Sequence, residues 1–326
     1  MFGFGILAEL FRRGIQHDII DRTGAAALIP EDATREIIQG LPEQSAALSL
    51  FRRTTMSRKQ QRMPALSALP TAYFVNGDTG QKKTSDVEWE NVYLNAEELA
   101  VIAPIPEAVL DDSDFDIWGE VRPRIEEAMG AAIDAAIFFG TNAPTAWPDD
   151  IVTAATSAAN TFQNGSVENT DLADDINAVM ALAEADGFEI NGFVAAPTFK
   201  SRLRGLRSAV GEMIFNPGLT AGTPSTLFGE PIRYTRNGGW VSTSADMIAG
   251  DFSKGIVAIR QDITAKILDQ AVIQDGAGTI VYNLAQQDMV ALRVTFRLAW
   301  CVANPINRVQ QTKASRYPFA VLTPAA

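Results

Sequence analysis

The chain has 326 residues and 47% of them are hydrophobic, which is enough for two domains with hydrophobic cores. Its formal charge of −12 argues against a surface that grips nucleic acid, because neutralising phosphates requires clustered Lys and Arg. One cysteine, Cys301, and one histidine, His17, exclude an internal disulfide and a zinc cluster, and no run of 18 apolar residues exists to span a membrane. We therefore expect a globular, cytoplasmic protein with no metal and no cofactor.

The first 50 residues predict an extension rather than a domain. Apolar residues at near-helical spacing in residues 1–22 predict an amphipathic segment, which is either a docked terminal helix or a removable leader. Residues 25–50 show no sustained period beyond a short helix around 30–38. We expect this part to be an arm that lies on another surface.

A basic segment follows the arm. No acidic residue lies between Ser45 and Gly77. The segment is either a solvated basic face or a contact with an acidic patch on a neighbouring copy. The predicted acidic partners are Asp111, Asp112, Asp114 and Asp116, and the basic residues are Arg52, Arg53, Arg58, Lys59 and Arg62.

Residues 72–94 predict a hairpin with a long polar tip. Its expected strands are 72–75 and 87–94, and the Asn-Gly pair at 76–77 favours a turn. An isolated two-stranded ribbon is marginal in water, so this hairpin also needs a partner. A β-prone run at 99–105 follows it.

The longest predicted element is a helix at about 114–139. Its apolar residues recur at steps of three and four, Ser113 or Asp114 is the expected N-cap, and Gly140 the expected stop. Roughly 25 residues make a rod of about 38 Å, which we interpret as a spine. Pro123 removes one helical hydrogen bond and Gly130 is a second weak point, so both are hinge candidates.

Beyond this spine helix, residues 141–169 are expected to be a connection, followed by a lobe of alternating elements. Helices are predicted at 171–185 and 198–207, a loop at 208–225, and strands at 192–196, 227–234, 247–250, 255–260 and 265–274. Every even position from Val290 to Val302 is apolar, which predicts a strand of about 43 Å that packs on the spine helix.

No catalytic constellation is complete. Gly3, Gly5 and Ala8 fit a dinucleotide motif, but no strand can precede them. The aspartates before the spine helix imitate a calcium loop, yet Ile117 holds its glycine position and Pro123 its twelfth. With neither a GxSxG elbow nor a Walker loop, we predict that the protein is not an enzyme and has no catalytic residues.

Several short segments, in order, resemble the Hong Kong 97-type major capsid protein of tailed phages. The segments are Pro104–Ser113, Phe139–Pro144 with Trp147 and Pro148, Gly192–Pro197, Gly229–Pro231 followed by Gly250–Phe252, and Arg293–Pro305. The resemblance implies an α+β fold with an N-terminal segment and arm (1–56), an extended β-hairpin loop (57–94), a peripheral domain (95–169 and 284–326) holding the spine helix, and an axial α/β domain (170–283).

By this resemblance, the chain forms hexamers and pentamers of an icosahedral phage head that is assembled in the host cytoplasm. The shell encloses double-stranded DNA without recognising its sequence and joins a portal, and separate scaffolding or decoration proteins are optional partners. No membrane is involved. A bacterial compartment of the encapsulin type is the alternative, since it shares the fold.

Some members of this family join a loop lysine to an asparagine of a neighbouring subunit, with a glutamate as base. Lys82 and Lys83 are the possible nucleophiles here, but Asp288 and Thr295 stand at the other two positions. An ionised carboxylate is a poor electrophile and a threonine hydroxyl is no base near neutral pH, so we expect no cross-link. A slipped register would offer Asn283 or Asn304 instead.

Overall fold

A computed structural model describes residues 45–75, 81–82, 84–112, 116–167, 171–206 and 226–325. The chain divides into two compact units, 1–40 and 41–326, and every described residue belongs to the second. The predicted segments 1–22 and 30–38, the loop 208–225 and the hairpin tip at 76–80 lie outside the described residues.

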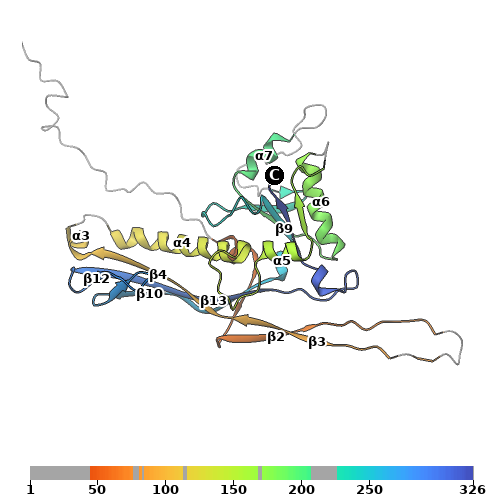
Figure 1. The fold of residues 1–326 in the computed structure, drawn as a ribbon, viewed down its shortest axis with the longest axis horizontal. Coiled ribbons are helices and arrows are strands. Elements are labelled where there is room, and N and C mark those ends of the chain that lie inside the picture. The colour runs from red at the N-terminus through yellow and green to blue at the C-terminus, as the bar shows by residue number, and fades with distance from the viewer. Residues whose placement is uncertain are drawn as a thin grey trace, which may run out of the picture. The chain divides into compact units, whose positions relative to one another are not determined.

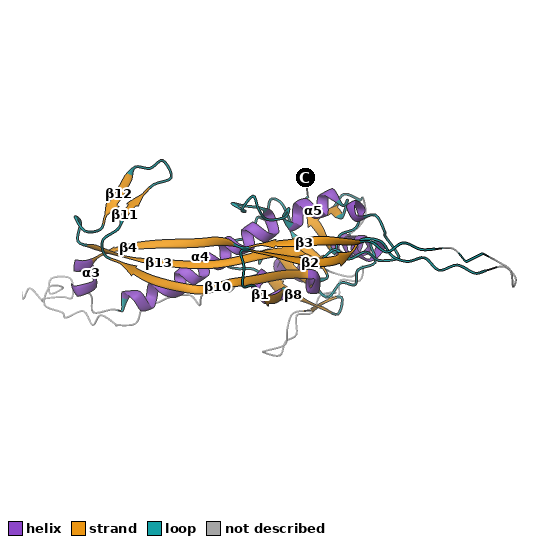
Figure 2. Ribbon diagram, turned by 90° about the horizontal axis from the view of Figure 1, so that it is seen from below, coloured by secondary structure: helices purple, strands orange, loops and turns teal. Residues whose placement is uncertain are grey.

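A four-stranded sheet in the order β1-β10-β13-β4 forms one layer of the second unit (Figure 2). Strand β13 is antiparallel to both of its neighbours, and β1 is parallel to β10. Two prolines are tolerated in β4 because it is an edge strand. The strands are β1 (Arg52–Thr55), β4 (Glu97–Pro106), β10 (Gly255–Leu268) and β13 (Met289–Val302).

Helix α4 (Ile117–Phe139) packs on this sheet, which confirms both the predicted spine helix and the predicted long strand. Met129 and Ile133 share a core with even-numbered residues of β13 such as Phe296. The N-cap is Asp116, whose Oδ1 accepts from the Gly119 amide at 3.0 Å, instead of Ser113 or Asp114, which are outside the described residues. Gly140 ends the helix with φ of 68°, as expected.

A six-stranded sheet in the order β5-β14-β9-β6-β8-β7 forms a separate lobe with three helices (Figure 1). Alternate residues of its strands face two cores: Val194 and Ile248 face the core shared with α4, while Phe193 and Met247 face α6 and α7. The elements are β5 (Thr161–Gln163), β6 (Gly192–Ala195), β7 (Thr226–Leu227), β8 (Glu230–Tyr234), β9 (Met247–Gly250), β14 (Phe319–Thr323), α5 (Ile151–Ser157), α6 (Leu172–Ala185) and α7 (Phe199–Gly205).

The lobe contains elements that the sequence did not predict. The expected connection at 141–169 holds α5 and β5, and β14 was not predicted. The predicted strands 255–260 and 265–274 are mostly one strand, β10, with register shifts against β13 between Ile259 and Thr264. Strand β11 (Val272–Gln274) then pairs with β12 (Ile280–Asn283) as a separate ribbon.

The strand pairing does not follow the predicted domain boundary at residues 283 and 284. Strand β10, from the predicted axial segment, pairs with β13 of the four-stranded sheet. Strand β14, from the predicted peripheral segment, pairs with β9 in the six-stranded lobe. The physical reason is that hydrophobic periodicity identifies a strand but not its partner.

A third sheet is the hairpin of β2 (Gln60–Leu66) and β3 (Trp89–Asn95). The predicted second strand, 87–94, agrees with β3, but the first is wrong: residues 72–75 form no strand, and β2 precedes them. Pro64 is tolerated because both strands of a two-stranded ribbon are edges. The remaining short helices are α2 (Ala46–Leu50), α3 (Glu107–Asp112) and the 3₁₀ turns η2 (Phe252–Lys254) and η3 (Lys313–Ser315).

Candidate assembly surfaces

The base of the β2–β3 hairpin is fixed to the four-stranded sheet. Leu94 is fully buried, and with Met56 and Ala96 it packs on the sheet face formed by Ala258 and Ala299. Polar contacts add to this attachment, because the Asn95 amide donates to the Ala146 carbonyl at 2.9 Å and the Trp147 indole donates to the Asn95 carbonyl at 3.1 Å. The root of the hairpin is therefore rigid.

The outer part of the hairpin presents apolar side chains to solvent. Phe74 is fully exposed, and Trp89 is 67% exposed. Val87, two residues before Trp89, is also exposed. Apolar side chains gathered on an extended ribbon without a core are typical of a surface that another protein covers.

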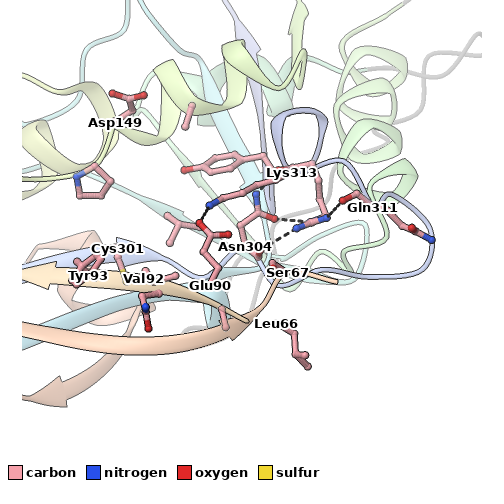
Figure 3. Close-up of a pocket in the computed structure, with 17 residues that line it drawn as sticks. Leu66, Ser67, Glu90, Val92, Tyr93, Asp149, Cys301, Asn304, Gln311 and Lys313 are labelled. Carbon is pink, nitrogen blue, oxygen red and sulfur yellow. Dashed lines mark hydrogen bonds and ion pairs between the residues drawn. The ribbon is translucent and has the colours of Figure 1, made fainter. Parts of the chain in front are cut away.

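A cavity of about 390 Å³ lies between the hairpin and the loop that follows β13 (Figure 3). Glu90 of β3 forms an ion pair with Lys313 across this cavity, and the Arg308 guanidinium donates to the Pro70 carbonyl at 2.9 Å. The two contacts connect the hairpin to the loop at separate points. The cavity is thus the gap between two elements that polar contacts hold together.

Arg316 organises the loop side of this cavity. The side chain is only 3% exposed, and it donates to Asn304 Oδ1 at 2.9 Å and to the Gln310 carbonyl at 2.8 Å. Burial lowers its pKa, while the nearby carboxylates of Asp186 and Glu90 oppose that shift. The buried charge is therefore matched by acceptors and fixes the loop conformation.

The predicted basic residues are all exposed. Arg53 donates to the Leu48 carbonyl at 2.6 Å, and Lys59 lies 3.8 Å from Glu97. Arg52, Arg58 and Arg62 make no ion pair with any described residue. These three side chains are available to a neighbour.

The structure does not bring the predicted acidic partners to the basic residues within one chain. Arg53 of β1 pairs with Val257 of β10, which in turn pairs with Trp300 near one end of β13. The Glu107 backbone amide, at the start of α3, donates to the Asp288 carbonyl at the other end of β13. Twelve residues of strand separate these ends, about 40 Å at about 3.3 Å per residue. Asp111 and Asp112 are exposed in α3, Asp116 caps α4, Lys82 is exposed, and Asp114 and Lys83 lie outside the described residues.

A buried carboxylate with four hydrogen-bond donors was not predicted. Asp134 is 1% exposed in the C-terminal half of α4, and its carboxylate accepts from the Ser45 hydroxyl at 2.6 Å and from the Ala46 and Ala47 amides at 2.9 Å. Asn237, from the loop after β8, donates to the same carboxylate at 2.6 Å. Burial raises the pKa of Asp134, and these four donors oppose that shift. One carboxylate thus joins the arm, the spine helix and the lobe.

The hinge candidates lie in different surroundings. Pro123 is half-buried inside α4 without ending the helix. Gly130 is buried, and a Cβ there would lie 3.3 Å from the Ser45 amide nitrogen, so its small size permits the arm to approach the helix closely. A role of either residue as a hinge stays a prediction.

Reactive chemistry has little support in the described part of the chain. Burial raises the pKa of the Cys301 thiol to about 11, which keeps it protonated. The described residues contain no group of three His, Cys, Asp or Glu arranged to hold a metal ion. Within those residues, no helix is both long and apolar enough to cross a membrane.

Comparison with known proteins gives a consistent set of matches. The model of the phage capsid family matches residues 25–307. The major capsid protein of Staphylococcus phage 80alpha is 30% identical over 279 residues, covering 83% of this chain and 80% of that protein. A solved structure from Microbacterium phage Oxtober96 is 40% identical with a TM-score of 0.81, over 94% of this chain and 99% of that one. Another, from Mycobacterium phage Adephagia, is 32% identical with a TM-score of 0.81, over 94% and 98%.

Proposed function

Because the chain belongs to the phage capsid family, we infer that it is the major capsid protein of a tailed phage. The observation that carries this inference is the family match over residues 25–307, together with the structural likeness along nearly the whole of both chains. Proteins of this family are structural subunits that assemble into a shell, which gives this chain a structural role instead of a catalytic one. The encapsulin alternative is not favoured, because the matched proteins named above come from phages.

We propose that the two sheets correspond to the two domains of a Hong Kong 97-type subunit. The four-stranded sheet with α4 is the peripheral domain, the six-stranded lobe is the axial domain, the β2–β3 hairpin is the extended loop, and residues 1–56 hold the arm. Strand pairing supports a division that differs from the one expected from sequence: β10 belongs with the peripheral domain and β14 with the axial domain.

In this proposal, hexamers and pentamers of the chain close into an icosahedral head in the host cytoplasm. The head encloses double-stranded DNA and joins a portal, with separate scaffolding or decoration proteins as optional partners. The net charge of −12 supports enclosure of the DNA without a grip on its phosphates.

We also propose that the free basic residues contact carboxylates of an adjacent subunit. Exposed Arg52, Arg58 and Arg62 have no partner among the described residues of their own chain, and exposed Asp111 and Asp112 lie at the far end of the sheet. A contact between the basic end of one copy and the acidic end of a neighbouring copy gives the arginines and the aspartates partners of opposite charge.

Electron microscopy of the purified protein, with a nuclease-protection assay on its particles, tests the proposed function. We expect closed icosahedral shells from the purified protein, and particles from infected cells that protect DNA. Shells filled with a protein cargo would support the bacterial compartment, and a stable monomer at assembly concentrations would rule out both.

A further inference from the structure

Charge is segregated along the part of the chain that builds the six-stranded lobe. The sequence has no Lys or Arg between Arg124 and Lys200, a stretch that includes α5 and α6. Cations then become frequent, with Lys200, Arg202 and Arg204 on α7 and Arg233 on β8. The lobe is therefore built from an acidic half and a basic half.

The two halves occupy opposite edges of the lobe. The strand order is β5-β14-β9-β6-β8-β7, and α6 packs over β14 and β5 at one edge while β8 lies near the other. Figure 1 shows α6 and α7 at opposite edges of the lobe. A subunit whose lobe carries opposite charges at its two edges is polar along the strand order of the sheet, so one edge differs chemically from the other.

The basic edge contains a cavity of about 650 Å³ that we call the cationic pocket. Lys200, Arg233 and Arg236 contribute its charges, and none of the described residues that line it is acidic. The hydroxyl of Tyr234, another lining residue, is buried without a hydrogen-bond partner among the described residues, and Lys200 Nζ lies 5.5 Å from its ring centroid. A pocket with several cations, and with no carboxylate among its described lining residues, suits an anionic group.

The acidic edge offers matching anions. Glu184 is exposed in the last turn of α6, and Glu189 is exposed shortly after it. Neither carboxylate forms a side-chain hydrogen bond or an ion pair with a described residue, and α6 itself contains no cation. These two carboxylates are therefore free to meet a neighbour.

We propose that the cationic pocket of one copy receives carboxylates from the α6 edge of a second copy, in a head-to-tail contact that closes rings. A heterologous contact needs two different complementary surfaces on one subunit, and the two edges of the lobe supply them. Complementary charges set the orientation and register of such a contact more than its strength. The proposal rests on the proposed function, because it assigns residues to self-assembly.

A second copy suits the pocket better than the phosphates of DNA. The chain has 39 acidic and 27 basic residues, so its overall field repels a polyanion. A second copy carries the same net charge, but in a ring its acidic edge meets the pocket at short range, where local pairing dominates over screened repulsion.

Two charge-reversal variants test the contact. The pocket variant is Lys200→Glu with Arg233→Glu, and the helix variant is Glu184→Lys with Glu189→Lys. Each variant alone places like charges at every contact, so native mass spectrometry should find far fewer rings than for the unmodified chain. A mixture of both variants should form rings only by alternation, which permits hexamers but forbids pentamers.

Combining all four substitutions in one chain restores opposite charges at every contact and should restore hexamers, pentamers and closed shells. The matched control, Arg260→Glu with Lys266→Glu, changes the net charge as the pocket variant does, but on exposed residues of β10, and should assemble normally. If the pocket variant does not fold, Lys200→Gln with Arg233→Gln replaces it, and its rings should dissociate at lower salt.

Rings of normal number and size from the pocket variant would overturn the contact while leaving the capsid function intact. Normal shells that lose nuclease-protected DNA would also overturn it and assign the pocket to DNA. The unmodified chain, measured alongside, tests the capsid function separately.

Discussion

At the residue scale, Asp134 connects the arm, the spine helix and the lobe through the hydrogen bonds that its carboxylate accepts. Asp134→Ala would leave the Ser45 hydroxyl and two backbone amides buried without their acceptor. Unsatisfied buried donors of this kind cost about 1–3 kcal/mol each, so we expect a loss of about 3 kcal/mol or more in the free energy of unfolding. Urea denaturation of unassembled subunits measures the loss.

The control for this substitution is Asp112→Ala, an exposed residue whose replacement should change the free energy of unfolding by less than about 0.5 kcal/mol. Faster proteolysis near Ser45 in Asp134→Ala alone would show that the arm has been released. Equal stability of the two variants would contradict the role of Asp134.

Sequence reasoning could not find this carboxylate cluster. Asp134 stands alone in the apolar run from Ala131 to Phe138, which is a signal of a buried carboxylate. Its partner Ser45 is 89 residues away, and the backbone amides that complete the site carry no sequence signal. Exposed charged residues such as Arg58 could be predicted as contact candidates from the sequence alone, because a run of like charges is recognised without knowing which residues it contacts in the fold.

At the scale of elements, the helix and the strand with the clearest hydrophobic period were predicted, whereas strands such as β2 and β14, which lack a clear one, were missed. Helix α4 and strand β13 have long, strict periods, and both were predicted. Strand β14 is a short run buried on both faces, which has no alternation to detect. Strand β2 alternates in exposure, yet its sequence QQRMPAL begins with three polar residues and contains a proline, so its pairing with β3 was not visible.

The α4 helix has a local weakness at Pro123. The proline lacks the amide that would bond to the Gly119 carbonyl, and Pro123→Ala should restore this hydrogen bond and stiffen the helix. We propose that the spine helix is more bent in a precursor shell than in the mature head, so we expect this variant to favour the expanded form. Cryo-electron microscopy of the particles measures the ratio of the two forms.

Gly130→Ala is the comparison for this hinge. It also stiffens α4, but its Cβ would crowd the Ser45 amide nitrogen at 3.3 Å, so it should weaken the arm contact as well. An unchanged ratio of precursor to expanded shells in Pro123→Ala would exclude a hinge at that residue.

The β2–β3 hairpin has a rigid base and an outer part without a core of its own. Deleting residues 72–86 removes the exposed Phe74 but keeps Leu94 and the ion pair of Glu90 with Lys313. The subunit should therefore still fold, while capsomers should fail to close into shells. Sedimentation and electron microscopy measure whether closed shells form. Phe74→Ser is a milder variant that removes only the exposed aromatic side chain. Closed shells from the deletion would contradict an assembly role of the hairpin.

At the scale of the whole molecule, the contact between basic and acidic ends should depend on salt. Arg58→Glu with Lys59→Glu should slow assembly, and charge reversal at Asp112 and Asp114 should restore it. Each exposed pair contributes only about 0.2–1 kcal/mol, so several must act together. Lys59 already lies 3.8 Å from Glu97, so Arg58→Glu alone should account for most of the effect.

Light scattering during assembly measures the rates, and Arg122→Glu, on the exposed face of α4, is the control. Failure of the Asp112 and Asp114 reversals to restore assembly would leave the basic segment as a solvated face.

The closed shell should be held together without covalent bonds between subunits. Thr295 stands where a base is needed, and its hydroxyl already bonds to that of Thr264 at 2.9 Å. Of the asparagines that a slipped register would offer, Asn304 is held by Arg316 on both its amide oxygen and its amide nitrogen. Lys82 is exposed, but the ionised carboxylate of Asp288, at the electrophile position, is a poor electrophile for its amine.

Boiling mature particles in detergent should therefore release one band near 35.2 kDa. Lys82→Arg and Lys83→Arg should leave both this band and the heat stability of the shell unchanged, since we expect neither lysine to form a covalent bond. Ladders of linked subunits, or an isopeptide bond at either lysine found by mass spectrometry, would contradict the prediction. Part of the stability of the shell would then come from a covalent bond between subunits, although the residues of one subunit are not arranged to form it.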